Sequence, residues 1–203
     1  MMAIQPYFAN EPFAAGLDHR PLGSILDELR SQLTAIDVRV QRVTEGLSTA
    51  QLDRQPGPKR WSVAQCLEHL ILFDSHYFAG IEERIAQMPP ARAEATYTMK
   101  GFDKWAYTFF GEKPPIRIPT ISSFDPHFDR TYGATILVRY RDHLSRLDQQ
   151  FRLALEHDVA RLRVHSPATS LVRFPYPAIA IIAVAHHRRH LGQAERTRAA
   201  IGL

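Results

Sequence analysis

The residues of this sequence best suited to chemistry are its histidines, ten in 203 residues, which stand beside a single cysteine, Cys66. One cysteine can form neither an intrachain disulfide nor a multi-cysteine zinc or iron–sulfur site. Nitrogen and oxygen must therefore hold any metal ion. His186 and His190 are one helical turn apart, a spacing that recurs in zinc sites because both imidazoles can reach the same ion.

The positions of these two histidines around their helix support the same interpretation as their spacing. At 100° per residue, one narrow sector of the helix contains Ile179, Ile182, His186, His190 and Gln193. Both histidines thus continue an apolar stripe that faces the core, whereas His187 points about 100° away. Buried imidazoles without partners are costly, because each ring carries a donor and an acceptor. The rings are satisfied either by ordinary hydrogen bonds or by a metal ion.

A third ligand has to come from another helix, because two ligands on one helix rarely close a site. His69 is the candidate, with Cys66 and His76 in the same sector of its helix. It lies on the flank of the apolar stripe, so periodicity alone does not force it inward. The other histidines are expected to be structural or on the surface: His19, His127, His143, His157 and His165.

Four long segments must position these side chains. Apolar residues recur at three- and four-residue steps, which predicts helices over about 22–48, 63–88, 131–157 and 175–202. Ser62 and Gln65 form a capping box after Trp61, which places a helix start at Val63. No β-alternation is visible. Residues 89–130 hold several prolines and are expected to form a long connection, with a short helix near "KWAYTFF".

These elements predict an all-α protein, a four-helix bundle with a long connection between its second and third helices. We expect one domain over 1–203, with an N-terminal tail of about 1–20. The net charge is +4 and charges of both signs alternate, so no nucleic-acid partner is expected. The longest apolar run, Ala178 to Ala185, is far shorter than the roughly 20 residues of a membrane span. With no signal peptide visible, the expected location is the cytoplasm.

The segments "WSVAQCLEHL" and "HHRRHLGQ" resemble the DinB-like, or YfiT-like, four-helix bundle superfamily over about Leu22 to Arg198. Its pattern is a Trp-Ser helix start, a histidine seven residues after the serine, and His-x-x-x-His before a Gly-Gln or similar pair. The positions that match are Ser62, His69, His186, His190, Gly192 and Gln193. The resemblance implies that the three histidines coordinate one divalent metal, with Gln193 behind a ligand. The long 89–130 connection departs from the short family type.

Three neutral imidazoles would leave the ion its double charge and an open position, the layout of a catalytic site. Zinc or nickel suits three nitrogens. Family members include low-molecular-weight thiol transferases and a thiol-dependent isomerase, so the resemblance implies transfer of a small thiol cosubstrate to an electrophilic small molecule. Cys66 is expected to pack in the core, which fits a thiol supplied from outside.

Two alternatives remain open. A metal-bound hydroxide could hydrolyse a substrate, with Glu68, Asp74 or His76 moving the proton. The protein could instead be a non-enzymatic metal-binding bundle in a stress response. A homodimer is compatible with long apolar helix faces.

Overall fold

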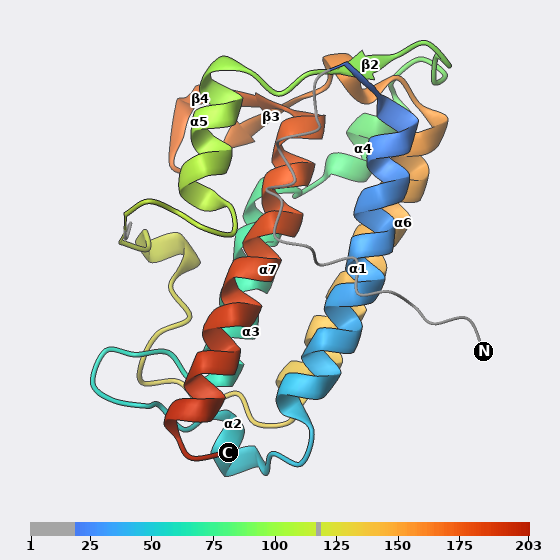
Figure 1. Cartoon of the computed structure of the whole chain (residues 1–203). Helices are drawn as coiled ribbons and strands as arrows, with labels where there is room; N and C mark the ends of the chain where they lie inside the picture. Colours follow the sequence, from blue (N-terminus) through green and yellow to red (C-terminus); the bar gives the residue numbers. More distant parts are fainter. Residues whose placement is uncertain (1–18, 117–118) are drawn as a thin grey trace, which may run out of the picture.

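The computed structural model describes residues 19–116 and 119–203, so most of the expected N-terminal tail lies outside the described residues. Four long helices form the body of the molecule (Figure 1). They are α1 (Leu22–Thr44), α3 (Val63–Tyr77), α6 (Thr135–Glu156) and α7 (Tyr176–Ala200). The expected all-α bundle is confirmed, although short strands are added to it.

The four helices pack as a square in which α1 lies opposite α3 and α6 lies opposite α7. Helices α1 and α3 each contact both α6 and α7. Figure 1 shows that α1 and α7 run in one direction, whereas α3 and α6 run in the other. Because α3 and α6 are parallel, the chain has to return along the length of the bundle between them. The long connection makes this return.

Side-chain caps set two helix starts. Ser62 accepts a hydrogen bond from the Gln65 backbone N–H, and the Gln65 side chain accepts one from the Ser62 N–H. This capping box begins α3 at Val63, as the sequence predicts. A second box, formed by Ser48 and Gln51, begins the short helix α2 (Thr49–Leu52). The first long helix was expected to run to about residue 48. It ends at Thr44 instead, because Ser48 caps the next helix.

The expected helix over 63–88 is wrong in its second half. Helix α3 ends at Tyr77, and Gly80 has a φ of +62° before α4 (Ile81–Ala86) begins. Glycine adopts this left-handed conformation without strain. The apolar periodicity carried on across the break because α4 also turns Ile81 and Ile85 into the core.

The long connection contains more structure than its prolines suggested. It includes β2 (Thr96–Tyr97), α5 (Gly101–Phe110) and the 3₁₀ turn η2 (Ser122–Phe124). The expected short helix is confirmed, and it extends from Gly101. Strand β2 pairs antiparallel with β1 (Arg20–Pro21), which ties the connection to the start of α1.

The expectation of no strand is wrong between α6 and α7. After the 3₁₀ turn η3 (Val159–Arg161), an antiparallel hairpin is formed by β3 (Arg163–Ser166) and β4 (Thr169–Pro175). Strand β3 has only four residues, and its inward positions hold Val164 and Ser166. With one apolar residue facing in, the period-two pattern was too short to detect.

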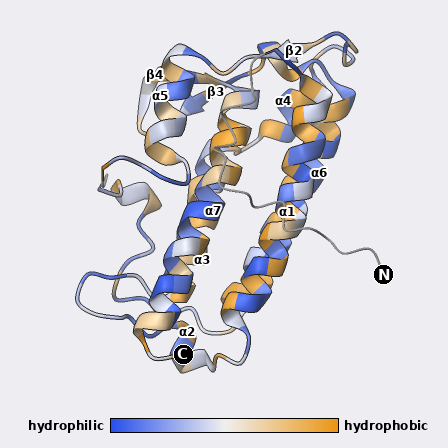
Figure 2. Cartoon of the chain, viewed as in Figure 1, coloured by the Kyte–Doolittle hydropathy of each residue, from blue (hydrophilic) through white to orange (hydrophobic). Residues whose placement is uncertain are grey.

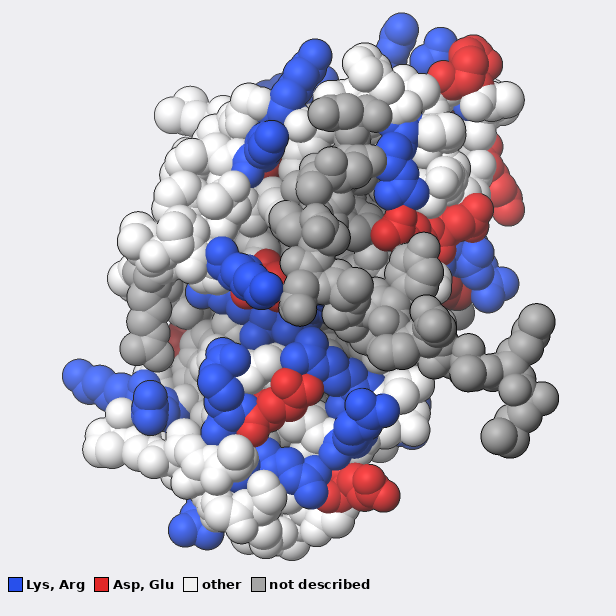
Figure 3. Space-filling model, in the orientation of Figure 1, with Lys and Arg blue, Asp and Glu red and all other residues white. Residues whose placement is uncertain are grey.

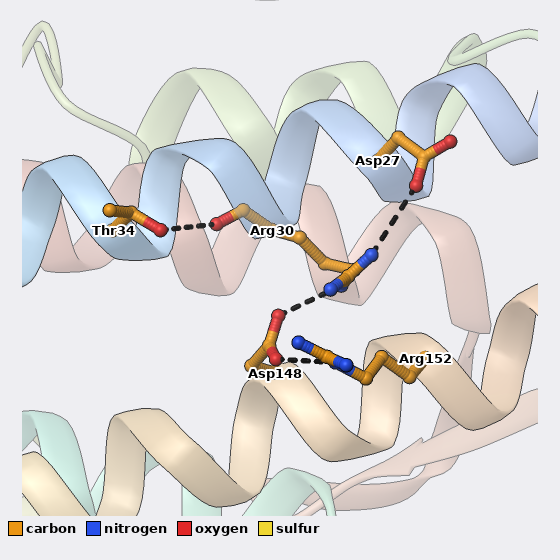
Figure 4. Close-up of polar contacts among 5 residues, drawn as sticks. All are labelled: Asp27, Arg30, Thr34, Asp148 and Arg152. Atoms are coloured by element: carbon orange, nitrogen blue, oxygen red, sulfur yellow. Dashed lines mark hydrogen bonds and ion pairs between the residues drawn. The ribbon is translucent and has the colours of Figure 1, made fainter.

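The core lies between the long helices. Helix α1 is amphipathic, and Figure 2 shows hydrophobic and hydrophilic residues alternating along it. Helix α7 differs, because its first ten residues are all buried and burial continues on several sides further along. On the outer side, Arg30 of α1 and Arg152 each lie 2.8 Å from the carboxylate of Asp148 in α6 (Figure 4).

The surface carries both signs of charge. On the face drawn in Figure 3, acidic side chains are interspersed among the basic ones. The ion pair of Arg39 with Glu195 joins α1 to α7 at 2.6 Å. Within the described residues, no helix has the length and apolar character needed to cross a membrane.

Candidate metal centre

Three histidine rings from two helices meet inside the bundle. His69 comes from α3, and His186 and His190 come from α7; their side chains are 3–5% exposed. Each ring offers one nitrogen to the cluster, and the three nitrogens lie within 4.8 Å of one another. Nε2 of His69 is 3.0 Å from Nε2 of His186.

The outer nitrogens of the three rings all have oxygen partners. Nδ1 of His69 lies 2.7 Å from the Phe124 carbonyl, and Nδ1 of His186 lies 2.7 Å from the Phe110 carbonyl. Nδ1 of His190 is 3.0 Å from Oε1 of Gln193. Amide and peptide oxygens only accept hydrogen bonds, so each Nδ1 carries a proton and donates it. In a neutral ring, Nε2 is then left with a bare lone pair.

The rings are neutral at neutral pH. Burial lowers the pKa of His69 to about 4. Burial also lowers the pKa values of His186 and His190 well below the ordinary value, and the neighbouring imidazoles act in the same direction. The positive charge of Arg189 lowers all three further. Protonation of the three Nε2 lone pairs is therefore unfavourable at neutral pH.

The three lone pairs suit a divalent cation. Nitrogens about 2.0–2.1 Å from a tetrahedral zinc ion are about 3.3 Å apart, close to the 3.0 Å between His69 and His186. Hydrogen bonds from metal-binding histidines to carbonyl oxygens fix the tautomer and the ring orientation, as they do here. The donor set fits one metal ion bound through three Nε2 atoms.

Aromatic side chains surround the rings. The Trp61 ring lies 4.6 Å from that of His69, and the Phe73 ring stacks on His186 at 4.3 Å between centroids. Phe124 packs on Phe73 at 5.3 Å. These contacts exclude water from the sides of the site, and a low local dielectric strengthens any charge interaction inside it.

The long connection supplies two of the three orienting oxygens. Phe110 is the last residue of α5, and Phe124 closes the turn η2. Gly111, directly after Phe110, has no room for a side chain, since a Cβ there would lie 2.4 Å from the Tyr107 carbonyl oxygen. The backbone directly after Phe110 is thus packed tightly against the last turn of α5, next to the Phe110 carbonyl.

Comparison with known proteins decides the family. The model of the DinB superfamily matches residues 32–194, most of the chain. The chain belongs to the DinB superfamily. YfiT from Bacillus subtilis, described as "a probable metal-dependent hydrolase with an unusual four-helix bundle topology", is a similar solved structure, with 18% identity, 87% of each chain covered and a TM-score of 0.49. A comparison with curated proteins finds no match.

The three proton-moving candidates of this DinB-superfamily chain all have partners elsewhere. The Glu68 carboxylate lies 2.8 Å from the Arg139 guanidinium of α6. Asp74 is fully buried, and its Oδ2 hydrogen-bonds His143 and His187. His76 is exposed, and its Nε2 hydrogen-bonds the Ser123 carbonyl at 3.0 Å.

The contact of Asp74 with two further histidines was not predicted from the sequence. His187, expected to point away from the buried face, is fully buried, and His143 was expected to be structural or on the surface. A signal for His187 existed in "AIAIIAVA", because a helix that is apolar all round is buried all round. For the pairing of Asp74 with His143, which joins α3 to α6, the sequence holds no such signal.

Proposed function

We propose that this DinB-superfamily protein binds one divalent ion, zinc or nickel, through His69, His186 and His190, and transfers a small thiol cosubstrate to an electrophile. One observation carries the proposal: the Nε2 atoms of His69 and His186 face each other at 3.0 Å, while both Nδ1 atoms donate to carbonyls. Two neutral acceptors at this distance repel each other unless a cation lies between them. Zinc and nickel both suit nitrogen ligands.

When bound, the ion would act as a Lewis acid and lower the pKa of a thiol or a water bound to it. The protein's own part is to hold the rings and to keep the site dry. The Phe110 and Phe124 carbonyls and the Gln193 amide orient the imidazoles. The three imidazoles and these three partners are all neutral, so none of them compensates the double charge of the ion, which favours an anionic ligand.

A thiol is better suited to this site than water. A free thiol has a pKa near 8.5 and water one of 15.7, so a thiol needs much less help to lose its proton. The candidate proton acceptors Glu68 and Asp74 are already paired with Arg139 and with two histidines. A reaction that starts from a thiol needs no such acceptor, because a thiol can lose its proton to solvent before it enters the site.

The reacting sulfur comes from a cosubstrate. Cys66 is fully buried, and burial raises the pKa of its thiol to about 12, which leaves almost no nucleophilic thiolate at neutral pH. In the reaction, the cosubstrate thiol loses its proton to solvent and its sulfur lone pair forms a bond to an electrophilic carbon. The bond from that carbon to its leaving group breaks, and the leaving group departs with the electron pair.

The test is to load the protein with zinc or nickel and supply small bacterial thiols with a haloarene. We expect a thioether and an equal amount of released halide, both in excess of the uncatalysed reaction. The His190→Ala variant should form neither above background. The thiol-transfer proposal is wrong if the metal-loaded protein yields no conjugate with any of the thiols tried.

Hydrolysis is the second candidate, and the position of His76 is the observation in its favour. This exposed ring lies 5.5 Å from the Phe124 ring, and the Phe124 carbonyl orients His69, so a proton acceptor in contact with solvent stands close to the site. Ester and amide substrates would then be cleaved by the metal-loaded protein and not after chelation. The His76→Gln change should abolish that cleavage, whereas thiol transfer should survive it.

A further inference from the structure

A second cluster of polar side chains lies beside the candidate metal centre and has a different proton arrangement. Asp74 of α3 is fully buried, and its Oδ2 is 2.8 Å from Nε2 of His143 in α6 and 2.7 Å from Nε2 of His187 in α7. The Tyr140 hydroxyl lies 2.6 Å from Nδ1 of His187. We call these four residues the Asp74 network.

The Asp74 carboxylate is ionised. Burial by itself raises its pKa, but His187 and the hydrogen bonds from both histidines outweigh burial and hold the pKa well below the usual range. An ionised carboxylate only accepts hydrogen bonds, so both Nε2 atoms carry protons and donate them. Hydrogen bonds therefore hold the network together. In the three-histidine cluster, by contrast, the Nε2 lone pairs face one another with no proton between them. His143, His187 and Asp74 need no cation between them.

The network joins the same helices that carry the metal ligands. His187 follows His186 directly, and Asp74 lies five residues after His69. Neighbouring residues of a helix point about 100° apart, so the two clusters lie on adjacent faces of α7. A rotation of α7 that displaced His186 from His69 would also separate His187 from Asp74. The contact between Asp74 and His187 consequently fixes the rotation that brings the ligands together.

The network also places a negative charge close to the three histidines. Oδ2 of Asp74 contacts His187 at 2.7 Å, and His187 directly follows the candidate ligand His186 in α7. The second oxygen of Asp74, Oδ1, is buried and has no hydrogen-bond partner among the described residues. A carboxylate in a region of low dielectric stabilises a nearby cation over a longer range than in water. Because the three histidine ligands are neutral, such a counter-charge would stabilise the bound ion.

We propose that Asp74 is a positioning residue and buried counter-charge for the metal site, acting through His187 and His143, and that the Asp74 network binds no second metal ion. The inference rests on the proposed metal binding. In this inference Asp74 helps to hold the ion, and His187 and Tyr140 fix the rotation of α7 about its axis.

The test compares Asp74→Asn with Glu68→Gln, which makes the same carboxyl-to-amide change at another buried position of α3. Metal affinity is measured by competition with a chelator, on samples shown to be folded. For Asp74→Asn we expect one ion per chain and an affinity about 10- to 100-fold lower. The absorption bands of the cobalt form should shift as well. Glu68→Gln should stay within about 3-fold of wild type and keep its cobalt bands, because Glu68 pairs with Arg139.

His143 gives a second test near the surface, where its side chain is 13% exposed. The His143→Gln variant keeps a donor for Asp74 and should retain most of the metal affinity, whereas His143→Ala should lose it. If the variants lower only the stability of the metal-free protein and leave affinity and cobalt bands unchanged, the positioning role is wrong. Two ions in the wild type, one of them lost in His143→Ala, would also overturn the inference.

The two proposals fail in different ways. If the wild type binds no divalent metal, or His190→Ala binds as much as the wild type, the proposed metal site itself is wrong. If His190→Ala loses the ion and Asp74→Asn binds it as tightly as the wild type, only the role of Asp74 is wrong.

Discussion

Nε2 of His69 lies 3.0 Å from Nε2 of His186, and the opposite nitrogen of each ring donates to a backbone carbonyl. A proton shared between the two Nε2 atoms would create a buried charge, and burial already lowers the pKa values of both rings. A divalent ion with a third nitrogen from His190 resolves the conflict without protonating any ring. The repulsion between these two acceptor nitrogens is the physical reason to expect a metal ion here.

Gln193 should control metal affinity without touching the ion. Its Oε1 accepts the hydrogen bond from Nδ1 of His190, which fixes the tautomer that leaves Nε2 bare. Replacing Gln193 with Leu removes the acceptor and should weaken metal binding by about 10-fold. Gln193→Glu keeps an acceptor and should bind at least as tightly as wild type. Chelator competition measures all three proteins, and equal affinities would show that Gln193 has no part in the site.

Gly111 should be required for the position of the Phe110 carbonyl. An alanine Cβ at Gly111 would lie 2.4 Å from the Tyr107 carbonyl oxygen, so the backbone after α5 has to shift. We expect Gly111→Ala to weaken metal binding by about 10-fold, because His186 loses its orienting partner. Gly57→Ala is the control, since its nearest contact would be an ordinary 3.8 Å. An unchanged affinity in Gly111→Ala would contradict the orienting role of the connection.

Cys66 should take no part in the chemistry. Its thiol is buried with a pKa raised to about 12, so in the native protein it should not react with a thiol reagent at pH 9 and should react once urea unfolds the chain. Cys66→Ala should bind metal and form the thiol conjugate as wild type does. Loss of conjugate formation in a variant that still binds metal would instead make Cys66 the nucleophile.

Asp148 should stabilise the packing of α1 on α6 in a pH-dependent way. Burial by itself raises its pKa, but the hydrogen bonds and positive charges of Arg152 and Arg30 together outweigh burial and lower it. A carboxyl whose pKa is lower in the folded state stabilises above its unfolded pKa and loses this contribution as the pH falls further. Asp148→Asn should cost about 0.5–1 kcal/mol at pH 7 and clearly less near pH 3, by urea unfolding.

Asp142, an exposed aspartate on the same helix, provides the control. Asp142→Asn should leave the unfolding free energy within about 0.5 kcal/mol of wild type at both pH values. The same loss for Asp148→Asn at pH 3 and pH 7 would show that ionisation of Asp148 is not involved.

Local patterns in the sequence predicted the parts of the fold that depend on local physics. The capping box at Ser62 and Gln65 located the start of α3, and the apolar stripe of α7 indicated that His186 and His190 turn inward. Periodicity left the direction of His69 open, and the resemblance to the DinB superfamily supplied it. The structure turns this ring inward because the Phe124 carbonyl, 55 residues away, accepts its hydrogen bond.

The features that were missed either have no detectable local pattern or depend on contacts between distant segments. The hairpin of β3 and β4 was too short for its alternation to be detected, and the break at Gly80 lies between two turns that both face the core. The pairing of Asp74 with His143 crosses from α3 to α6, and no spacing in either helix encodes it. The sequence therefore predicted the three histidines and Gln193 as candidates, while the Phe110 and Phe124 carbonyls that hydrogen-bond two of the rings became visible only in three dimensions.

The proposed metal site requires that His69, His186 and His190 hold one divalent ion. The most direct measurement is an anomalous difference map from crystals of the metal-loaded protein, collected on both sides of the zinc or nickel absorption edge. We predict one strong peak per chain, between the three Nε2 atoms, which disappears in His190→Ala. A peak between Asp74, His143 and His187 instead, or no peak at the three histidines in fully loaded crystals, would contradict the account.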